Sequence, residues 1–223
     1  MKKSLLLLAL TLVCNLSFAQ IDNQLKIENY TIPDEIEIIV ESEITEEMKK
    51  VGTVFAKAKG VTTIAAINNV NNRALRKLKT EASMRGGSHI LVTQETQENT
   101  VFSKTSAYSA IIYRSNQSNV NEIKELLESK EFSYRFERKY NRNKFDHKDK
   151  LFNQLLNQPL QKNQLNPPYV KNGKIILEIM EFIGNRNRLI KYEVIANSDS
   201  QILLFKEEIP GKEMKMIILE KVK

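Results

Sequence analysis

The sequence predicts an α+β protein: an N-terminal β-α-β-β unit followed by a mostly antiparallel β-meander domain with one or two helices. The first observation is an apolar stripe at every fourth residue, followed at once by two glycines of the kind that end a helix. The stripe and its stop consist of Val70, Ala74, Leu78, Ala82, Gly86 and Gly87. The second observation is a C-terminal stretch of candidate strands that are separated at short intervals by turn residues.

Residues 1–19 have the features of a signal peptide. Lys2 and Lys3 form the positive end, residues 5–13 form an apolar core, and small residues precede a cleavage point after Ala19. The apolar core is too short for a transmembrane helix, which needs about 20 residues. A retained anchor and a lipoprotein processed at Cys14 are the alternatives, and the bulky Val13 disfavours the lipoprotein. We therefore expect an exported protein, periplasmic or secreted, with no transmembrane segment after cleavage.

Composition narrows the class of partner. Cleavage would remove Cys14, the only cysteine, so we expect no disulfide, and the absence of tryptophan argues against a carbohydrate-stacking surface. The formal net charge is +7. Residues 20–118 carry 12 basic and 12 acidic side chains, whereas residues 119–223 carry 20 and 15. For an exported protein, this basic second half favours anionic envelope material over nucleic acid.

The first unit is predicted over residues 35–115, after a loose, polar leader at residues 20–34. Its elements are a strand at residues 35–44, a strand at 51–59, the striped helix, an extended run at 90–92, a long polar loop at 94–105 and a strand at 106–113. The strand at 35–44 alternates glutamate with isoleucine, which places its glutamates on a solvated face. These are Glu35, Glu37, Glu41 and Glu43.

The helix end and the strands after it carry a family resemblance. The residues concerned are Arg73-Ala74-Leu75-Arg76-Lys77-Leu78, Glu81-Ala82, Gly86-Gly87-Ser88-His89-Ile90-Leu91-Val92, Ala107-Tyr108 and Tyr113. Over residues 35–115 this pattern resembles the RcsF-like and YbjQ-like domains of bacterial envelope proteins. The resemblance implies a compact β-α-β-β domain. RcsF-like proteins carry disulfide-forming cysteines and a lipid anchor that the mature chain would lack, so a stress-sensor role is not implied.

The second unit is predicted over residues 120–223, after a linker of small polar residues at 115–119. It begins with a short helix at 122–127 and a strand at 132–139, in which Phe132, Tyr134 and Phe136 share one face. Asp146 is expected to cap a helix whose apolar face comes from residues 151–156. Four strands complete the domain, at residues 174–182, 189–196, 201–207 and 213–222. They form a meander or curl into a small, partly open barrel.

Residues 132–150 supply the candidate binding surface, with seven basic and three acidic residues interleaved with aromatic ones. Such a mixture can bind single-stranded nucleic acid. Period-two alternation and the export signal argue against that interpretation here. We expect contact with an anionic partner through Arg138, Lys139, Arg142 and Lys144.

No residue set in the sequence predicts catalysis, a metal or a cofactor. A zinc site needs three or four ligands, and the chain offers two separated histidines, His89 and His147. Ser88 follows a double glycine but lacks the surroundings of a P-loop or of a nucleophile elbow. An enzyme would require a cleft that contains one of these histidines with an acidic neighbour.

The sequence therefore favours an exported, non-enzymatic envelope protein that interacts with a protein or an anionic surface polymer. The alternative is a carrier that encloses a small apolar ligand within the C-terminal strands. Its cavity would be lined by Leu177, Ile179, Tyr192, Val194, Leu203 and Phe205.

Overall fold

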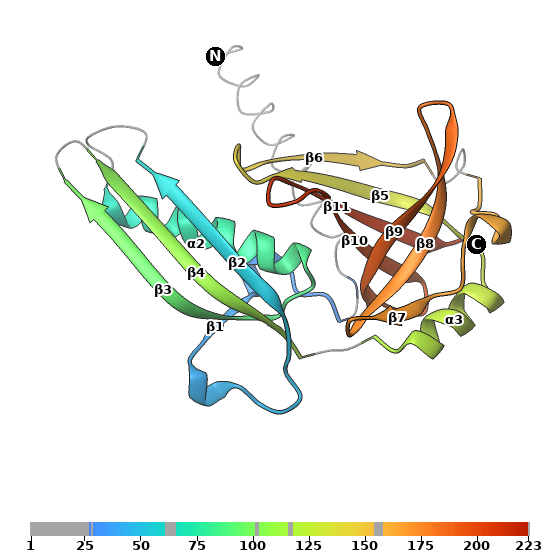
Figure 1. Cartoon of the computed structure of the whole chain (residues 1–223), viewed down its shortest axis with the longest axis horizontal. Helices are drawn as coiled ribbons and strands as arrows, with labels where there is room; N and C mark the ends of the chain where they lie inside the picture. Colours follow the sequence, from blue (N-terminus) through green and yellow to red (C-terminus); the bar gives the residue numbers. More distant parts are fainter. Residues whose placement is uncertain are drawn as a thin grey trace, which may run out of the picture.

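The computed structural model describes residues 27, 29–60, 66–100, 103–115, 118–153 and 158–222. Two β-sheets lie side by side, and each has a helix against one face (Figure 1). The predicted α+β class is confirmed. The chain passes from one sheet to the other at the predicted linker, of which residues 115, 118 and 119 are described.

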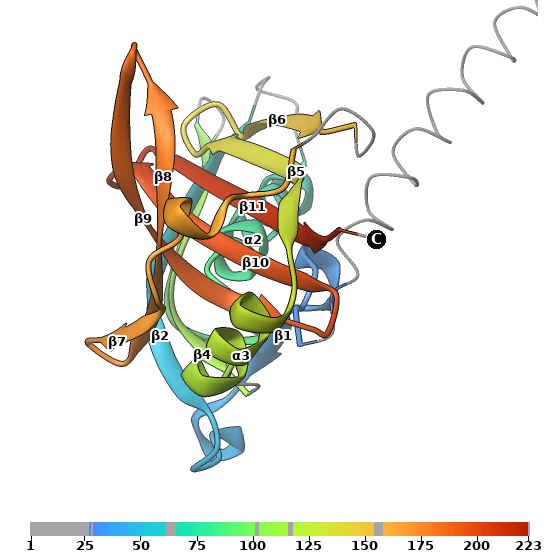
Figure 2. The same cartoon turned by 90° about the vertical axis from the view of Figure 1, so that its right-hand side faces the viewer.

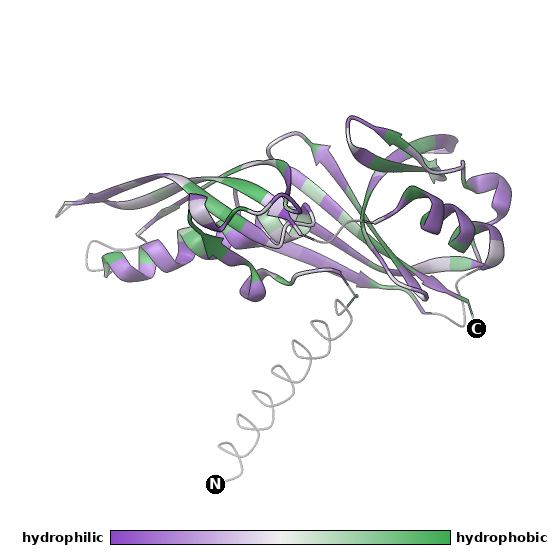
Figure 3. Cartoon of the chain, turned by 90° about the horizontal axis from the view of Figure 1, so that it is seen from below, coloured by the Kyte–Doolittle hydropathy of each residue, from purple (hydrophilic) through white to green (hydrophobic). Residues whose placement is uncertain are grey.

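The first unit is a four-stranded sheet in the order β1-β3-β4-β2, in which only β1 and β3 are parallel. Its elements are β1 (Glu37–Ile39), β2 (Lys49–Lys59), α2 (Ile67–Met84), β3 (His89–Asn99) and β4 (Lys104–Arg114). Helix α2 lies along one face of the sheet, as the view from below shows (Figure 3). All four residues of the predicted stripe are buried there, and Gly86 has a φ of +72°, which confirms the glycine stop.

The second unit is a seven-stranded antiparallel sheet in the order β6-β5-β11-β10-β9-β8-β7 (Figure 2). Its elements are α3 (Val120–Ser129), β5 (Phe132–Asn141), β6 (Asp146–Leu151), β7 (Tyr169–Lys171), β8 (Lys174–Ile183), β9 (Arg186–Asn197), β10 (Gln201–Ile209) and β11 (Glu213–Lys221). Short 3-10 turns occur at Pro33–Glu35, Glu41–Glu43 and Lys162–Gln164. Strands β8 to β11 confirm the predicted meander.

Three cores hold these layers together. One lies between α2 and the first sheet. A second lies between α3 and one face of the second sheet, where Ile123 and Leu177 are fully buried. The third core joins the two units, and we call it the shared core. It consists of Ile27, Tyr30, Met84, Phe136, Tyr140, Ile195, Ala196, Leu203, Phe205, Met214, Met216 and Ile218.

Gly86 lets the two units approach closely. On β9, Ile195 is an extra residue in the pairing with β10, because Leu203 pairs with Ala196 and Leu204 with Val194. A β-carbon added at Gly86 would lie 2.8 Å from the Ile195 β-carbon and 2.6 Å from a nitrogen of Arg114. The glycine that ends α2 is therefore also a contact point of the shared core.

Three predictions for the first unit were wrong. The strand at 35–44 is reduced to β1, partly because the Glu43 carboxylate accepts the Val40 N–H at 2.9 Å and forms a local turn instead. The polar loop at 94–105 is largely strand: β3 runs to Asn99, and cross-strand contacts such as Tyr108 to Glu95 replace apolar packing. The leader was expected to be loose, but Ile27 and Tyr30 are buried in the shared core.

Two predictions for the second unit were also wrong. Asp146 begins β6 and caps no helix, because this segment pairs with β5 along its whole length. Residues 154–157 of the expected helix lie outside the described residues. Phe132, Tyr134 and Phe136 do not share one face, since Arg135 is an extra residue opposite Ile218 and Leu219. Phe132 and Tyr134 therefore pack on the α3 side, and Phe136 lies in the shared core.

Replacing Gly86 with alanine tests the close approach. We expect Gly86→Ala to lower the free energy of unfolding by about 2–4 kcal/mol, because left-handed strain adds to the clash with Ile195. Gly173→Ala is the matched control, since Gly173 has a φ of +73° but open space around it. Urea denaturation should show a clearly smaller loss for the control, and equal losses would contradict the assignment.

Candidate functional site

The surface where the two units meet is crossed by three ion pairs. Arg114 at the end of β4 lies 3.5 Å from Glu193 of β9, and Arg85 after α2 pairs with Glu207 of β10. In the third pair the arginine comes from the second unit: Arg142 of the β5–β6 turn lies 2.8 Å from Glu81 of α2. The pairs surround the shared core and fix the relative placement of the two sheets.

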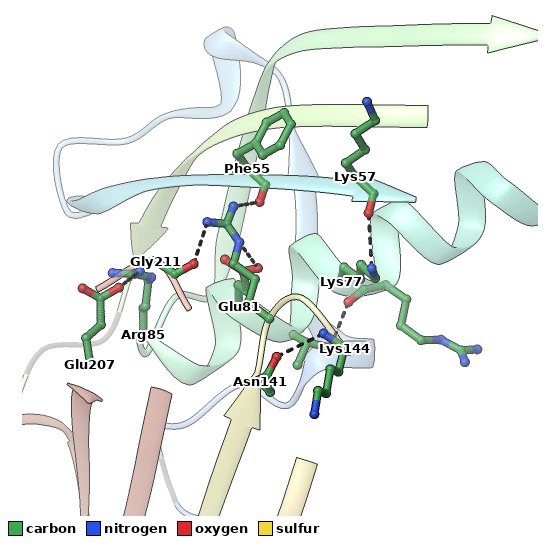
Figure 4. Close-up of polar contacts among 12 residues, drawn as sticks. Phe55, Lys57, Lys77, Glu81, Arg85, Asn141, Lys144, Glu207 and Gly211 are labelled. Carbon is green, nitrogen blue, oxygen red and sulfur yellow. Dashed lines mark hydrogen bonds and ion pairs between the residues drawn. The ribbon is translucent and has the colours of Figure 1, made fainter. Parts of the chain in front are cut away.

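Arg142 also protects the free edge of the first sheet. Its guanidinium donates to the carbonyl oxygens of Phe55 on β2 and of Gly211, and both acceptors are labelled in Figure 4. Two cations of α2 donate to the next outward carbonyls of the same strand. They are Lys77, bound to the Lys57 oxygen, and Arg73, bound to the Lys59 oxygen. Such capping hinders pairing with another strand.

Arg114 closes the end of α2. Its Nε donates to the Gly86 carbonyl and its Nη2 to the Arg85 carbonyl, both at 2.7 Å, so it satisfies carbonyls that the helix leaves free. Burial lowers the pKa of the Arg114 guanidinium, and the nearby Glu193 acts in the opposite direction. The second oxygen of Glu193 binds Lys174 at 2.6 Å. Glu193 is thus held between one cation from each unit.

A cleft of about 680 Å³ opens beside this triad, at the junction of the units. This volume is within the usual range for small-ligand sites, which favour such junctions. Its lining residues come from the start of β2, the end of β4, the linker, the β7–β8 hairpin and β9. They are Lys49, Lys50, Val51, Arg114, Ser118, Asn119, Val120, Val170, Asn172, Gly173, Lys174, Ile175, Glu193 and Val194.

The lining is basic, with four cations against the single carboxylate of Glu193. Lys49 and Lys50 are exposed, and neither has an acidic group within ion-pair distance in the part of the chain that the structure describes. A bulge at Val51, between the pairs of Lys50 and Gly52 with β4, shifts these lysines relative to the rest of β2. Free ammonium groups beside valine and isoleucine side chains suit an organic anion.

The sequence did not single out this cleft. Its charged residues lie on four different strands, so no local motif joins them. The only local signal is the Lys49-Lys50 pair at the start of a strand. Lys174 and Glu193 are neighbours on β8 and β9, and Arg114 joins them only when the two units meet.

The four predicted contact residues have different environments. Arg138 is mostly buried and binds both oxygens of Asp149, at 2.8 and 2.7 Å, and Arg142 is used between the units. Lys139 and Lys144 lie on the surface around a depression of about 220 Å³. Lys148 is the third lysine of that depression, and three carboxylates balance the charge of the three lysines. The carboxylates are those of Asp146, Glu208 and Glu213.

Neither histidine lies in the cleft. His89 Nε2 is 3.4 Å from Glu37, and its Nδ1 is 2.7 Å from Ser88 Oγ, which already accepts the Ser115 N–H. His147 is half exposed and 3.9 Å from Asp149. Within the described ranges, no group of three or more histidine or acidic residues could hold a metal ion, and no helix is long and apolar enough to cross a membrane.

No protein-family model matches the chain, and comparisons with curated proteins and with solved structures found no match either. The resemblance to RcsF-like and YbjQ-like domains therefore stays a prediction, and the case for a function depends on the geometry.

The six residues expected to line a carrier cavity do not share one interior. Leu177, Ile179, Tyr192 and Val194 belong to the core beneath α3. Leu203 and Phe205 belong to the shared core on the opposite face of the sheet. All six are buried. The alternation along β10, together with the bulge at Ile195, separates the two sets, so they cannot line a common cavity.

The burial of the Glu81 carboxyl group predicts a pH dependence of stability. Burial raises the pKa of Glu81 from its ordinary value of 4.5 to about 7, although Arg142 and Arg85 oppose this shift. Because the folded pKa is the higher one, the folded chain binds more protons between these values. Its stability should therefore fall by about 2–3 kcal/mol as the pH rises from about 4.5 to 7.

Urea denaturation of the wild type and of Glu81→Gln between pH 4 and 8 measures this effect. The glutamine variant lacks the titrating group, so the difference between the two stabilities should change across the window. Parallel pH profiles would contradict the raised pKa.

Proposed function

We propose that the protein is an exported, non-enzymatic binding protein that holds an acidic group of an anionic surface polymer in the cleft between its two units. The observation that carries this proposal is the pair Lys49 and Lys50 at the mouth of a basic cleft, neither of which has an acidic partner among the described residues. An acidic segment of an envelope protein offers the same chemistry and is the second candidate partner.

The electrostatics of the cleft favour an anion. Glu193 neutralises part of the charge of Arg114 and Lys174, while Lys49 and Lys50 stay available to a ligand. Both lysines are exposed, so their attraction to a ligand is screened by salt and acts best when several charges act together. A polymer with repeated acidic groups meets this requirement better than a single small anion.

Export supports a polymer of the envelope as the partner. Residues 1–19 have the pattern of a signal peptide. The polymer is identified here only by its chemistry: repeated phosphate or carboxylate groups on a flexible chain. We propose no nucleic-acid partner and no cofactor.

Titration with inorganic polyphosphate, followed by calorimetry, tests the cleft. Lys49→Gln together with Lys50→Gln should weaken binding roughly tenfold, and the wild-type affinity should fall steeply with salt. The matched control is Lys212→Gln with Lys221→Gln, which removes two exposed lysines outside the cleft. Equal losses in the two double variants would reduce the interaction to non-specific charge attraction and contradict the proposal.

A further double variant separates the cleft from the surface that the sequence predicted. Lys139→Gln with Lys144→Gln removes two of the three lysines that line the smaller depression. If the cleft is the site, polyphosphate affinity should change less than twofold. A larger loss here than in the Lys49 and Lys50 variant would move the site to the β5–β6 turn.

A further inference from the structure

Strands β8 and β9 continue beyond the second sheet as a two-stranded arm, defined here as residues 180–191. Strand β9 pairs with β10 only from Glu193 onward, and β7 pairs with β8 only up to Ile176. Within the arm, the two strands pair with each other alone, from Met180 with Leu189 to Ile183 with Arg186. Both side views show this hairpin projecting past its neighbours (Figures 1 and 2).

A tight turn and hydrogen bonds at the base hold the arm in a fixed orientation on the second sheet. Its turn, Gly184-Asn185, has φ angles of +56° and +64°, which are typical of the tight turn that matches strand twist. At its base, the Glu181 carboxylate accepts hydrogen bonds from the hydroxyls of Tyr192 and Tyr134, and it lies 3.9 Å from Lys215. An isolated hairpin is only marginally stable, so this anchor fixes the arm to the sheet.

The arm exposes three large apolar side chains, two of them close to the turn and the third, Leu189, opposite Met180 where the arm begins. Phe182 is 71% exposed, and Ile183 and Leu189 are each 40% exposed. They contribute little to any of the three cores, and exposed apolar groups gathered at one point mark an interaction site.

Two arginines accompany these apolar residues. Arg186 and Arg188 are exposed, and no carboxylate lies within ion-pair distance of either among the residues that the structure describes. The nearest acidic residue along the arm, Glu181, is engaged by the tyrosines and Lys215. Among the described residues, the arm therefore combines two guanidinium groups that have no acidic partner with three exposed apolar side chains.

We propose that the tip of this arm enters the headgroup region of an anionic lipid bilayer. Apolar side chains bury to a depth of about 5–10 Å in such an interface, while arginines bind lipid phosphates. The arm is long enough, since four residues from Met180 to Ile183 span about 13 Å. Its attraction to the surface would add to the binding by the cleft, and it does not depend on that site.

The distribution of apolar residues favours a bilayer over a protein groove. Directly paired residues share a face, so Phe182 and Leu189 lie on one side of the hairpin and Ile183 lies on the other with the arginines. A groove receives one face of a segment, whereas a lipid interface surrounds the inserted tip and solvates both faces.

A tryptophan at the tip provides the test, because the chain contains no tryptophan of its own. Phe182→Trp in the full chain should show a blue-shifted emission on addition of phosphatidylglycerol-containing vesicles, and quenching by quenchers attached to the lipid. Val40→Trp is the matched control, because Val40 is 60% exposed between β1 and β2 of the first unit and belongs to neither the arm nor the cleft. Its emission should stay unchanged.

The arginines are tested in the Phe182→Trp background. Arg186→Gln with Arg188→Gln should weaken the vesicle-dependent shift roughly 20-fold in lipid concentration, since each basic residue contributes several-fold to binding at an anionic surface. An unchanged Phe182→Trp emission, or an equal shift of Val40→Trp, would overturn the proposal. An equal shift with pure phosphatidylcholine would overturn the assigned role of the arginines.

Discussion

The second sheet is apolar on both faces, and the rest of the structure follows from this constraint. Along β10 and β11, consecutive residues are buried without interruption. They are Ile202, Leu203, Leu204, Phe205, Met214, Lys215, Met216, Ile217, Ile218 and Leu219. A sheet of this kind needs cover on each side, because exposure of either face would leave a large apolar surface in water. Helix α3 covers one face, and the end of the first unit covers the other.

The cleft results from the way in which the first unit packs against the second sheet. The shared core brings Gly86 against Ile195, and Arg114 then lies between the last carbonyls of α2 and the Glu193 carboxylate. Beyond this contact the two units diverge, and the lysines at the start of β2 face the β7–β8 hairpin across the opening. The candidate site thus depends on the junction, and disturbing the junction would alter the cleft as well as stability.

Patterns of local origin were predictable from the sequence. The stripe of α2 and its glycine stop, α3 and the four C-terminal strands all follow from periodicity and turn residues, and each was confirmed. Continuous apolar runs at residues 202–205 and 216–219 also indicate a sheet buried on both faces, a feature that the prediction of a meander or partly open barrel did not include.

Features that depend on distant partners were not predictable in this way. The polar part of β3 after the predicted run at 90–92, and all of β6, are held by neighbouring strands, so hydropathy did not reveal them. Single extra residues, Arg135 and Ile195, change the face of the side chains around them, and no residue type signals such a bulge. The charges of the cleft were missed because they come from four strands that are distant in the sequence. Arg138 and Arg142 were predicted to contact an anionic partner, but each pairs with a carboxylate of the chain itself.

The central claim is that the shared core makes the two units one cooperative structure. Hydrogen exchange of the intact chain in increasing urea measures this most directly, because it reports the opening free energy of individual amides. The account predicts that the most protected amides of α2 and β4 converge with those of β10 and β11 on one opening free energy. Two separate values, with the first sheet opening while the second stays protected, would contradict it.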